Sequence, residues 1–462
     1  MTTSSRLSMG EMFALIGKTS AEDIAHLPFP GHVATDSRHV EPGGAFVALE
    51  GERTDGHRYI PQAVERGAGL VVVRRGKRPD EIATPCVELD DPELDLARLA
   101  SLYLDRAQIE EVVAVTGSVG KTTTRAALQK VLSGRFRVHA AERSLNTRIG
   151  CTATVLAMPL DTDLLLMEFG ANKPGEIAEL AGLFPPTTVL ITRVASVHLE
   201  GFGTIEGVLK GKMEIVGSRR LRRFLYGRDD PLLHTAASSL KAARPDVDVR
   251  SVGVSDADFH VLLPHFEMVR GTPVLIFKLH DRDGGATVVD ANVWGEHMVL
   301  PLAFASAVGS LLGLRLGRCA EALRGFMSLP GRGRAFHLED GRFLVDDAYN
   351  ANPASMRASI ETFASLQAEG KMLVLGEMRE LGEGAVQYHR ELGPLLDRFD
   401  DVVLVGDLWR EALPEVPGRS FVRRWEDAMD LVERTDWRGL LVKGSLSVGL
   451  PNLVQALCEG AR

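Results

Sequence analysis

The chain has 462 residues, of which 45% are hydrophobic, and a formal net charge of -9 at pH 7. This length suggests about three domains, and the acidic balance argues against nucleic acid as a partner, because phosphate backbones are held by clustered lysine and arginine. The four cysteines have no metal-binding or redox spacing, and no stretch approaches the ~18 apolar residues of a membrane span. We therefore expect a cytoplasmic protein without a membrane span.

The first hundred residues predict a small α/β unit. Short apolar runs at 44–49, 69–73 and 84–89 are typical of buried strands, and helical periodicity occupies 59–66 and 94–107.

The middle of the chain predicts a parallel sheet with crossover helices. Apolar runs at 112–115, 164–168 and 189–192 are each followed by a turn and a helical period. Further on, the segments 249–262 and 273–279 indicate a β-rich insertion.

The last part of the chain predicts a Rossmann-like unit. After a proline and glycine boundary at 329–333, four short apolar strands are spaced by helices, at 343–347, 371–376, 401–406 and 440–443. The predicted fold class is therefore α/β with three domains, at 1–108, 109–331 and 332–462.

The segment 112–124 predicts a phosphate-binding loop, because an apolar strand runs into glycines and then into Lys-Thr at the start of a helix. Glycines let backbone N–H groups approach phosphate oxygens, Lys121 can reach the terminal phosphates, and the Thr122 hydroxyl can ligate Mg²⁺. The longer form of this motif needs glycine at Val115, so this is the shorter form, and an ordinary strand-to-helix turn is the alternative. The expected ATP-contacting residues are Gly117, Ser118, Val119, Gly120, Lys121, Thr122 and Thr123.

Two polar residues follow central strands, at the edge where open α/β sheets bind ligands. Glu168 ends one apolar run and His198 follows another. A carboxylate and an imidazole there can complete the coordination of metal ions bound to ATP. The alternatives are a helix cap or surface charge for Glu168 and a structural imidazole for His198.

Eight blocks in order along the chain resemble the Mur ligase family. The blocks are Thr35–Arg38 with Asp55–His57, the phosphate loop, Met167–Ala171 with Gly175–Ile177, His198–Gly203, Gly211–Ile215, Asp346–Pro353, Leu375–Gly382 and Val442–Ser445. The Asp346–Pro353 and Leu375–Gly382 blocks favour the branch that adds D-alanyl-D-alanine to a UDP-N-acetylmuramoyl-tripeptide.

The resemblance implies an ATP-dependent amide ligase. ATP would phosphorylate the terminal carboxylate of the UDP-linked peptide, and the dipeptide amine would attack the acyl phosphate. The implied catalytic residues are Lys121, Glu168, His198 and Lys212. Two Mg²⁺ ions are implied, one on Thr122 and Glu168 and one on His198 and Lys212, with Lys212 carbamoylated because an ammonium cannot ligate a metal.

Further roles follow from the resemblance alone. Arg332 and Asp347 are expected to contact ATP when the domains close. The expected substrate contacts are Ser37, Arg38, Asn146, Thr147, Asn350, Asn352 and Lys443. The alternatives are a surface turn around Ser37 and helix capping by the two asparagines of the last domain.

The chain departs from the family pattern at four places. Asn146-Thr147-Arg148 stands where Asn-Asn-Glu is usual, Arg193 and Pro301 replace asparagines, and Leu446 replaces an arginine. In the family, the asparagine that Pro301 replaces is expected to face adenine. The contacts that set specificity therefore change, while the phosphate-binding and metal-binding residues remain. A family member that joins other substrates, or a nucleotide-binding scaffold without ligation, therefore stays open. We expect a monomer.

Overall fold

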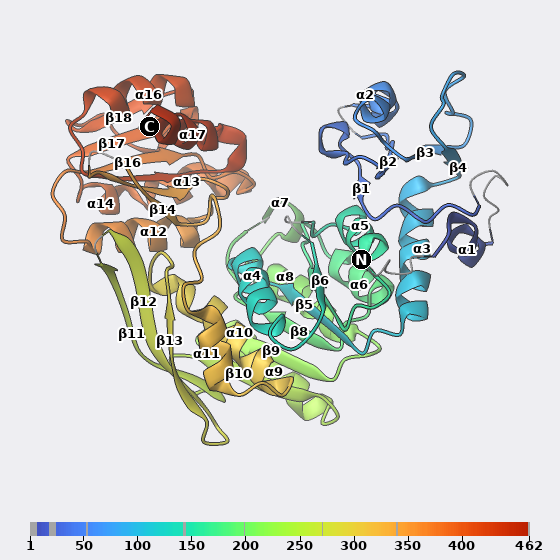
Figure 1. The fold of residues 1–462 in the computed structure, drawn as a ribbon. Helices are drawn as coiled ribbons and strands as arrows, with labels where there is room; N and C mark the ends of the chain where they lie inside the picture. The colour runs from blue at the N-terminus through green and yellow to red at the C-terminus, as the bar shows by residue number, and fades with distance from the viewer. Residues whose placement is uncertain are drawn as a thin grey trace.

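The computed structural model describes residues 7–17, 25–51, 54–141, 145–197, 199–269, 271–338 and 341–460. Its strands form three separate sheets, one in each of three consecutive α/β units (Figure 1). In these ranges no helix has the length and apolar character that crossing a membrane requires. The predicted fold class is confirmed.

The N-terminal unit has a four-stranded parallel sheet in the order β1-β2-β3-β4. Three predicted strands and both predicted helices are present, whereas the two-residue β1 and helix α1 were not predicted. The elements are α1 (Met9–Leu15), β1 (Val33–Ala34), β2 (Ala45–Val47), α2 (Ile60–Glu65), β3 (Leu70–Arg74), β4 (Cys86–Leu89) and α3 (Pro92–Ala107).

Helix α3 joins the first unit to the second. It begins where the Asp91 carboxylate accepts a hydrogen bond from the Leu94 N–H at 3.1 Å, with Pro92 in its first turn. Its apolar face, which includes Leu96 and Leu99, belongs to one core with strands of both units. The two units are therefore packed through a shared core.

The central unit has a nine-stranded sheet in the order β13-β12-β11-β10-β9-β8-β5-β7-β6. Its strands are β5 (Glu111–Thr116), β6 (Val138–Ala140), β7 (Leu164–Glu168), β8 (Thr188–Ile191), β9 (Arg223–Gly227), β10 (Asp248–Gly253), β11 (Phe259–Val269), β12 (Thr272–Asp281) and β13 (Ala286–Ala291). Its helices are α4 (Lys121–Leu132), α5 (Arg148–Ala157), α6 (Glu176–Leu183), α7 (Leu199–Phe202), α8 (Ile205–Met213), α9 (Pro231–Ala243), α10 (Val299–Leu311) and α11 (Leu316–Leu323).

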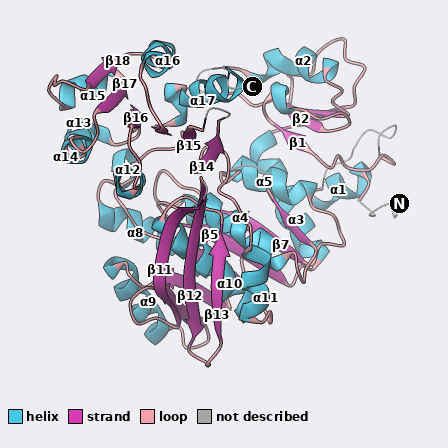
Figure 2. Ribbon diagram, turned by 60° about the vertical axis from the view of Figure 1, so that its left-hand side comes forward, coloured by secondary structure: helices cyan, strands magenta, loops and turns pink. Residues whose placement is uncertain are grey.

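The middle strands are buried on both faces, which explains their continuous apolar runs. Along β5, Val112 and Ala114 belong to the core shared with α3, whereas Val113 and Val115 belong to the core on the other face of the sheet. The predicted β-rich insertion is instead a continuation of this sheet, because β10 pairs in parallel with β9 and with β11. Figure 2 shows β11, β12 and β13 as three long neighbouring strands, which pair antiparallel.

The C-terminal unit has a six-stranded sheet in the order β14-β15-β19-β16-β17-β18. The four predicted strands are present, and the two edge strands β14 and β18 were missed. Its strands are β14 (Arg334–His337), β15 (Phe343–Asp347), β16 (Lys371–Gly376), β17 (Asp401–Val405), β18 (Arg419–Val422) and β19 (Gly439–Lys443). Its helices are α12 (Pro353–Ser365), α13 (Ala385–Arg390), α14 (Gly393–Leu396), α15 (Asp407–Ala412), α16 (Trp425–Arg434) and α17 (Leu450–Gly460).

An aromatic cluster connects the central and C-terminal units. Strands β11 and β12 run up to the C-terminal unit (Figure 1), where Phe266 meets Trp294 edge to face at 5.4 Å between ring centroids. Trp294 in turn lies 6.1 Å from Phe363 of α12. The third unit is thus held over the carboxyl ends of the central strands.

Candidate active site

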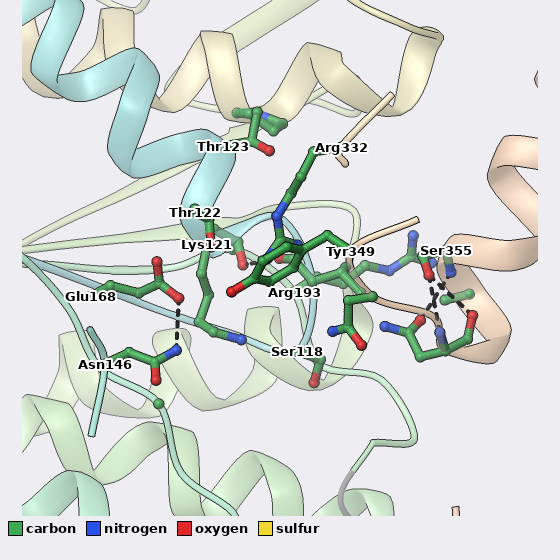
Figure 3. A pocket seen from close by; sticks show the side chains of 18 of the residues that line it. Ser118, Lys121, Thr122, Thr123, Asn146, Glu168, Arg193, Arg332, Tyr349 and Ser355 are labelled. Atoms are coloured by element: carbon green, nitrogen blue, oxygen red, sulfur yellow. Dashed lines mark hydrogen bonds between the residues drawn. The ribbon is translucent and has the colours of Figure 1, made fainter. Parts of the chain in front are cut away.

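A cavity of about 1100 Å³ lies at the carboxyl ends of the central strands and is lined by residues of all three units. Figure 3 shows part of its wall, where the side chains of the phosphate loop face those of the C-terminal unit. Representative lining residues are Glu93 on α3, Lys121 on α4, Glu168 on β7, and Arg332, Asp347 and Leu446 of the last unit.

The predicted phosphate loop lies between β5 and α4 and opens into this cavity. Gly117 has φ +141°, and a Cβ there would lie 2.1 Å from the Thr192 Oγ1, so only glycine fits. The Ser118 N–H donates to the Arg193 carbonyl at 2.7 Å, which ties the loop to the end of β8. Because α4 begins directly after Gly120, its first N–H groups are available to an anion.

Lys121 is partly accessible from the cavity although protein surrounds it. Its ammonium donates to the Gly117 carbonyl at 2.8 Å. Burial lowers the pKa of Lys121, while the nearby Glu168 carboxylate opposes that shift. The phosphate loop therefore carries a cation that is bound mainly to its own backbone.

Glu168 is buried at the end of β7, with 3% of its surface exposed. Its Oε1 accepts a hydrogen bond from the Asn146 Nδ2 at 2.9 Å (Figure 3), whereas its Oε2 has no hydrogen-bond partner among the described residues. The Arg125 Nε lies 3.8 Å from that second oxygen. Glu168 is therefore neither a surface charge nor a helix cap, and one buried oxygen remains available to a ligand.

Lys212 on α8 is buried, with 1% of its surface exposed. Its ammonium donates to the Ala171 carbonyl at 3.3 Å and lies 5.4 Å from the centroid of the Phe202 ring. Burial, assisted by the positive charge of Lys121, lowers the pKa of Lys212 from 10.5 to about 7. Without the family resemblance, the sequence favours a solvated helix charge at Lys212, and its burial shows that this interpretation is wrong. His198 lies outside the described residues.

In the cavity wall formed by the C-terminal unit, the polar side chains pair with other groups of the same unit. The Lys443 ammonium lies 2.8 Å from the Asp347 carboxylate and donates to the Asn350 carbonyl at 3.1 Å. The Asn352 Oδ1 accepts a hydrogen bond from the Ser355 N–H at 2.9 Å and caps α12. All three of the residues predicted to contact substrate in this unit, namely Asn350, Asn352 and Lys443, line the cavity.

Arg332 extends from the linker between the units towards the phosphate loop (Figure 3). Its guanidinium stacks over the Tyr349 ring, 4.4 Å from the centroid. The linker is fixed by Asp346, whose carboxylate accepts a hydrogen bond from the Gly331 N–H at 2.7 Å. Arg332 thus lines the cavity, and its predicted contact with ATP stays a prediction.

Ser37 and Arg38 are not among the described residues that line the cavity. The Ser37 hydroxyl donates to the Gln62 Oε1 at 2.6 Å, and the exposed Arg38 guanidinium lies 2.7 Å from the Asp36 carboxylate. If they contact the UDP-sugar, as the sequence predicts, they do so on the first unit and outside the described wall of the cavity.

The four departures from the family pattern all lie on the cavity wall. Thr147 caps α5, since its Oγ1 accepts a hydrogen bond from the Gly150 N–H at 3.4 Å. Arg148 lies 3.0 Å from Glu93 and 2.6 Å from Glu179, so the arginine that stands in place of the usual acid bridges α3 and α6. The remaining three are Arg193, Pro301 and Leu446.

Sequence reasoning missed Arg125 and Glu93. Arg125 follows Lys121 by four residues, so helical spacing alone could have placed both on the face of α4 towards β7. Glu93 carried no signal, because a charge in the first turn of a helix is ordinary.

Comparisons with known proteins agree along most of the chain. The Mur ligase family catalytic domain matches residues 31–113, the Mur ligase middle domain matches 115–309, and the Mur ligase glutamate ligase domain matches 331–445. The UDP-N-acetylmuramoyl-tripeptide–D-alanyl-D-alanine ligase of Bacillus subtilis is 33% identical over 92% of this chain and 93% of the relative. The Escherichia coli enzyme of the same name is 31% identical over the same shares.

Solved structures show the same arrangement. MurF from Acinetobacter baumannii superimposes with a TM-score of 0.78 at 28% identity, covering 92% of this chain and 93% of that one. MurF from Thermotoga maritima, solved in complex with ADP, superimposes with a TM-score of 0.76 at 26% identity, covering 93% and 97%.

Proposed function

The chain belongs to the Mur ligase family of ATP-dependent ligases, and from this premise we propose that it adds D-alanyl-D-alanine to a UDP-N-acetylmuramoyl-tripeptide in peptidoglycan precursor synthesis. The observation that carries the proposal is the single cavity in which the phosphate loop, the buried Glu168 and the paired wall of the last unit face one another. We also propose a monomer that acts in the cytoplasm.

The chemistry asks the protein mainly to position and neutralise anions. Phosphoryl transfer to a carboxylate brings two negative groups together, and the attacking amine must then reach the acyl phosphate. Lys121 and the N–H groups at the start of α4 would neutralise the transferred phosphate. Arg332, whose plane is held by Tyr349, would add a second cation from the other side of the cavity.

The residues present fit a Mg²⁺ ion beside the phosphate loop. A hard cation prefers oxygen ligands, and the buried Glu168 Oε2 has no hydrogen-bond partner in the described part of the chain, while Thr122 lines the same cavity. The ion would supply positive charge against the developing charge of the phosphoryl group. We propose that Thr122 and Glu168 hold it.

A second ion would use Lys212 and His198. Because the pKa of Lys212 is about 7, a substantial fraction of its amine is neutral near pH 7, whereas an ordinary lysine is almost fully charged there. The neutral nitrogen can attack CO₂, forming an N–C bond and releasing one proton to water, which leaves a carbamate anion. That product offers the oxygen ligands that the ammonium lacks.

The three units would divide the substrates among them. Residues 1–108, with Ser37 and Arg38, would bind the UDP-sugar end, and Asn146 and Thr147 would lie near the muramoyl group. The unit 109–331 would bind ATP. Residues 332–462 would bind the dipeptide through Asn350, Asn352 and Lys443 and bring Asp347 to ATP.

The test is ADP release that depends on both carboxylate and amine. The full-length protein would be incubated with ATP, Mg²⁺, D-alanyl-D-alanine and UDP-muramoyl-tripeptides that carry either lysine or diaminopimelate third, and the ligated product would be weighed by mass spectrometry. We expect release only when both substrates are present. Release with another amine would favour a ligase of different specificity, and nucleotide binding without release would favour a scaffold.

A further inference from the structure

The buried carboxylate of Glu168 has different partners at its two oxygens. The Asn146 amide donates to Oε1 at 2.9 Å, while the Arg125 Nε stays 3.8 Å from Oε2, beyond hydrogen-bond distance. Among the described residues, neither Oε2 nor the Arg125 Nε has a hydrogen-bond partner, although both atoms are buried. A buried ion pair whose facing atoms make no hydrogen bond is costly in a protein interior unless a ligand supplies the missing contact.

We propose that Asn146 and Arg125 are positioning residues that set the affinity of Glu168 for a divalent cation. Asn146 fixes the carboxylate, and Arg125 balances its charge without occupying Oε2. The inference rests on the proposed function, because the cation is the Mg²⁺ assigned there to Thr122 and Glu168.

Asn146 is held on both its backbone and its side chain. Its carbonyl accepts a hydrogen bond from the Gly170 N–H at 2.8 Å. A Cβ at Gly170 would lie 2.8 Å from the Asn146 Cγ, so the glycine is what lets the amide reach Glu168. Without this amide, the carboxylate is free to turn towards Arg125 and close the 3.8 Å gap.

Arg125 is held away from the carboxylate by its own second contact. Its Nη1 donates to the Ala141 carbonyl, and its side chain is 4% exposed. A fixed positive charge at this distance attracts Glu168, but it also repels a cation that binds to Oε2. The two positioning residues should therefore act in opposite directions on metal affinity.

The experiment measures Mn²⁺ binding to the full-length protein with ADP, by electron paramagnetic resonance in mildly alkaline buffer. We expect Asn146→Ala to weaken binding about 10–100-fold, the usual range for loss of a residue that orients a metal ligand. We expect Arg125→Met to tighten binding while lowering the unfolding temperature in the absence of Mn²⁺. Arg125→Lys keeps the charge and should bind within a few-fold of wild type.

Matched controls lie on the same chain. Asn452→Ala on α17 removes an exposed amide, and Arg135→Met just beyond α4 removes an exposed charge, and both should bind Mn²⁺ like wild type. If Glu168→Gln binds Mn²⁺ as wild type does, the metal assignment of the proposed function fails. If Glu168 is required but Asn146→Ala and Arg125→Met bind like wild type, or both weaken binding, the positioning roles are overturned.

Discussion

The two walls of the cavity differ in how their polar groups are satisfied. On the central wall, among the residues that the structure describes, Glu168 leaves one buried oxygen without a hydrogen-bond partner, and the buried Lys212 donates a hydrogen bond to a carbonyl. On the C-terminal wall, Lys443 pairs with Asp347 and Asn352 caps α12. Buried polar groups that lack hydrogen-bond partners indicate a binding site for a ligand, whereas buried groups that are paired within the protein mainly maintain the shape of the wall. Substitutions on the central wall should therefore mainly lower activity, whereas substitutions on the C-terminal wall should mainly lower stability.

Among substitutions on the central wall, Lys121→Ala should give the largest loss of ligation rate. Loss of a preorganised electrostatic contact commonly reduces the rate ~10²–10³-fold, and this lysine contributes little to a core. Steady-state ADP release would be measured beside thermal unfolding, which should be nearly unchanged. A variant that keeps more than roughly a third of the turnover would remove the phosphate loop from the mechanism.

Lys212→Ala should be nearly inactive if the lysine carries a metal-binding carbamate, because the phosphoryl group then loses a cation positioned against it. Acetate or formate should restore part of the rate by filling the vacated anion site. Neutral molecules of similar size should not restore it, and rescue by them equally well would contradict the carbamate.

The same lysine predicts a pH dependence of stability in CO₂-free buffer. Its pKa is about 7 in the folded protein and near 10.5 when unfolded, so between these values the unfolded chain binds a proton that the native state does not. The free energy of unfolding of the wild type should therefore rise relative to Lys212→Met across this window and run parallel to it below pH 7. Parallel curves throughout would mean that the pKa is not depressed.

Lys443→Met should instead lower stability on the C-terminal wall. Removing one partner of a buried ion pair leaves Asp347 uncompensated, at a cost of about 3 kcal/mol. Chemical denaturation would measure this loss, and the double variant Lys443→Met/Asp347→Asn should recover part of it. A fully stable but inactive single variant would show that this wall is catalytic rather than structural.

Asn352→Ala should cost about 1 kcal/mol through the lost cap of α12. Asn352→Ser keeps an oxygen acceptor at the cap and is the matched control, so it should retain most of the stability. If the serine variant is stable but the KM for the dipeptide rises, then Asn352 both caps the helix and contacts the substrate.

The smallest effect concerns the nucleobase. Pro301 lies beside the phosphate loop, 3.8 Å from where a Gly120 Cβ would lie, and has no amide to offer a purine. An apolar slot discriminates weakly, so GTP or ITP should support measurable ligation. A preference for ATP of ~10⁴ or more would mean that another polar group reads the base.

The sequence by itself determined the local parts of this protein. The phosphate loop is encoded by neighbouring residues, because the glycines, Lys121 and Thr122 act through backbone geometry within one turn. The buried strands were also predictable, since a strand covered on both faces must be apolar throughout, as β5 is. Edge strands such as β18 escaped because their residues are only half-buried and carry no such pattern.

Only the tertiary structure decided which charges are buried and which are paired. In sequence Lys212 looks like an ordinary helical lysine, and only its burial in the folded protein lowers its pKa to about 7. Lys443 reaches Asp347 because β19 and β15 pair in register, across almost one hundred residues of chain. Likewise, the Arg125 and Glu168 pair exists because α4 packs beside β7, and such contacts depend on long-range packing that no local pattern encodes.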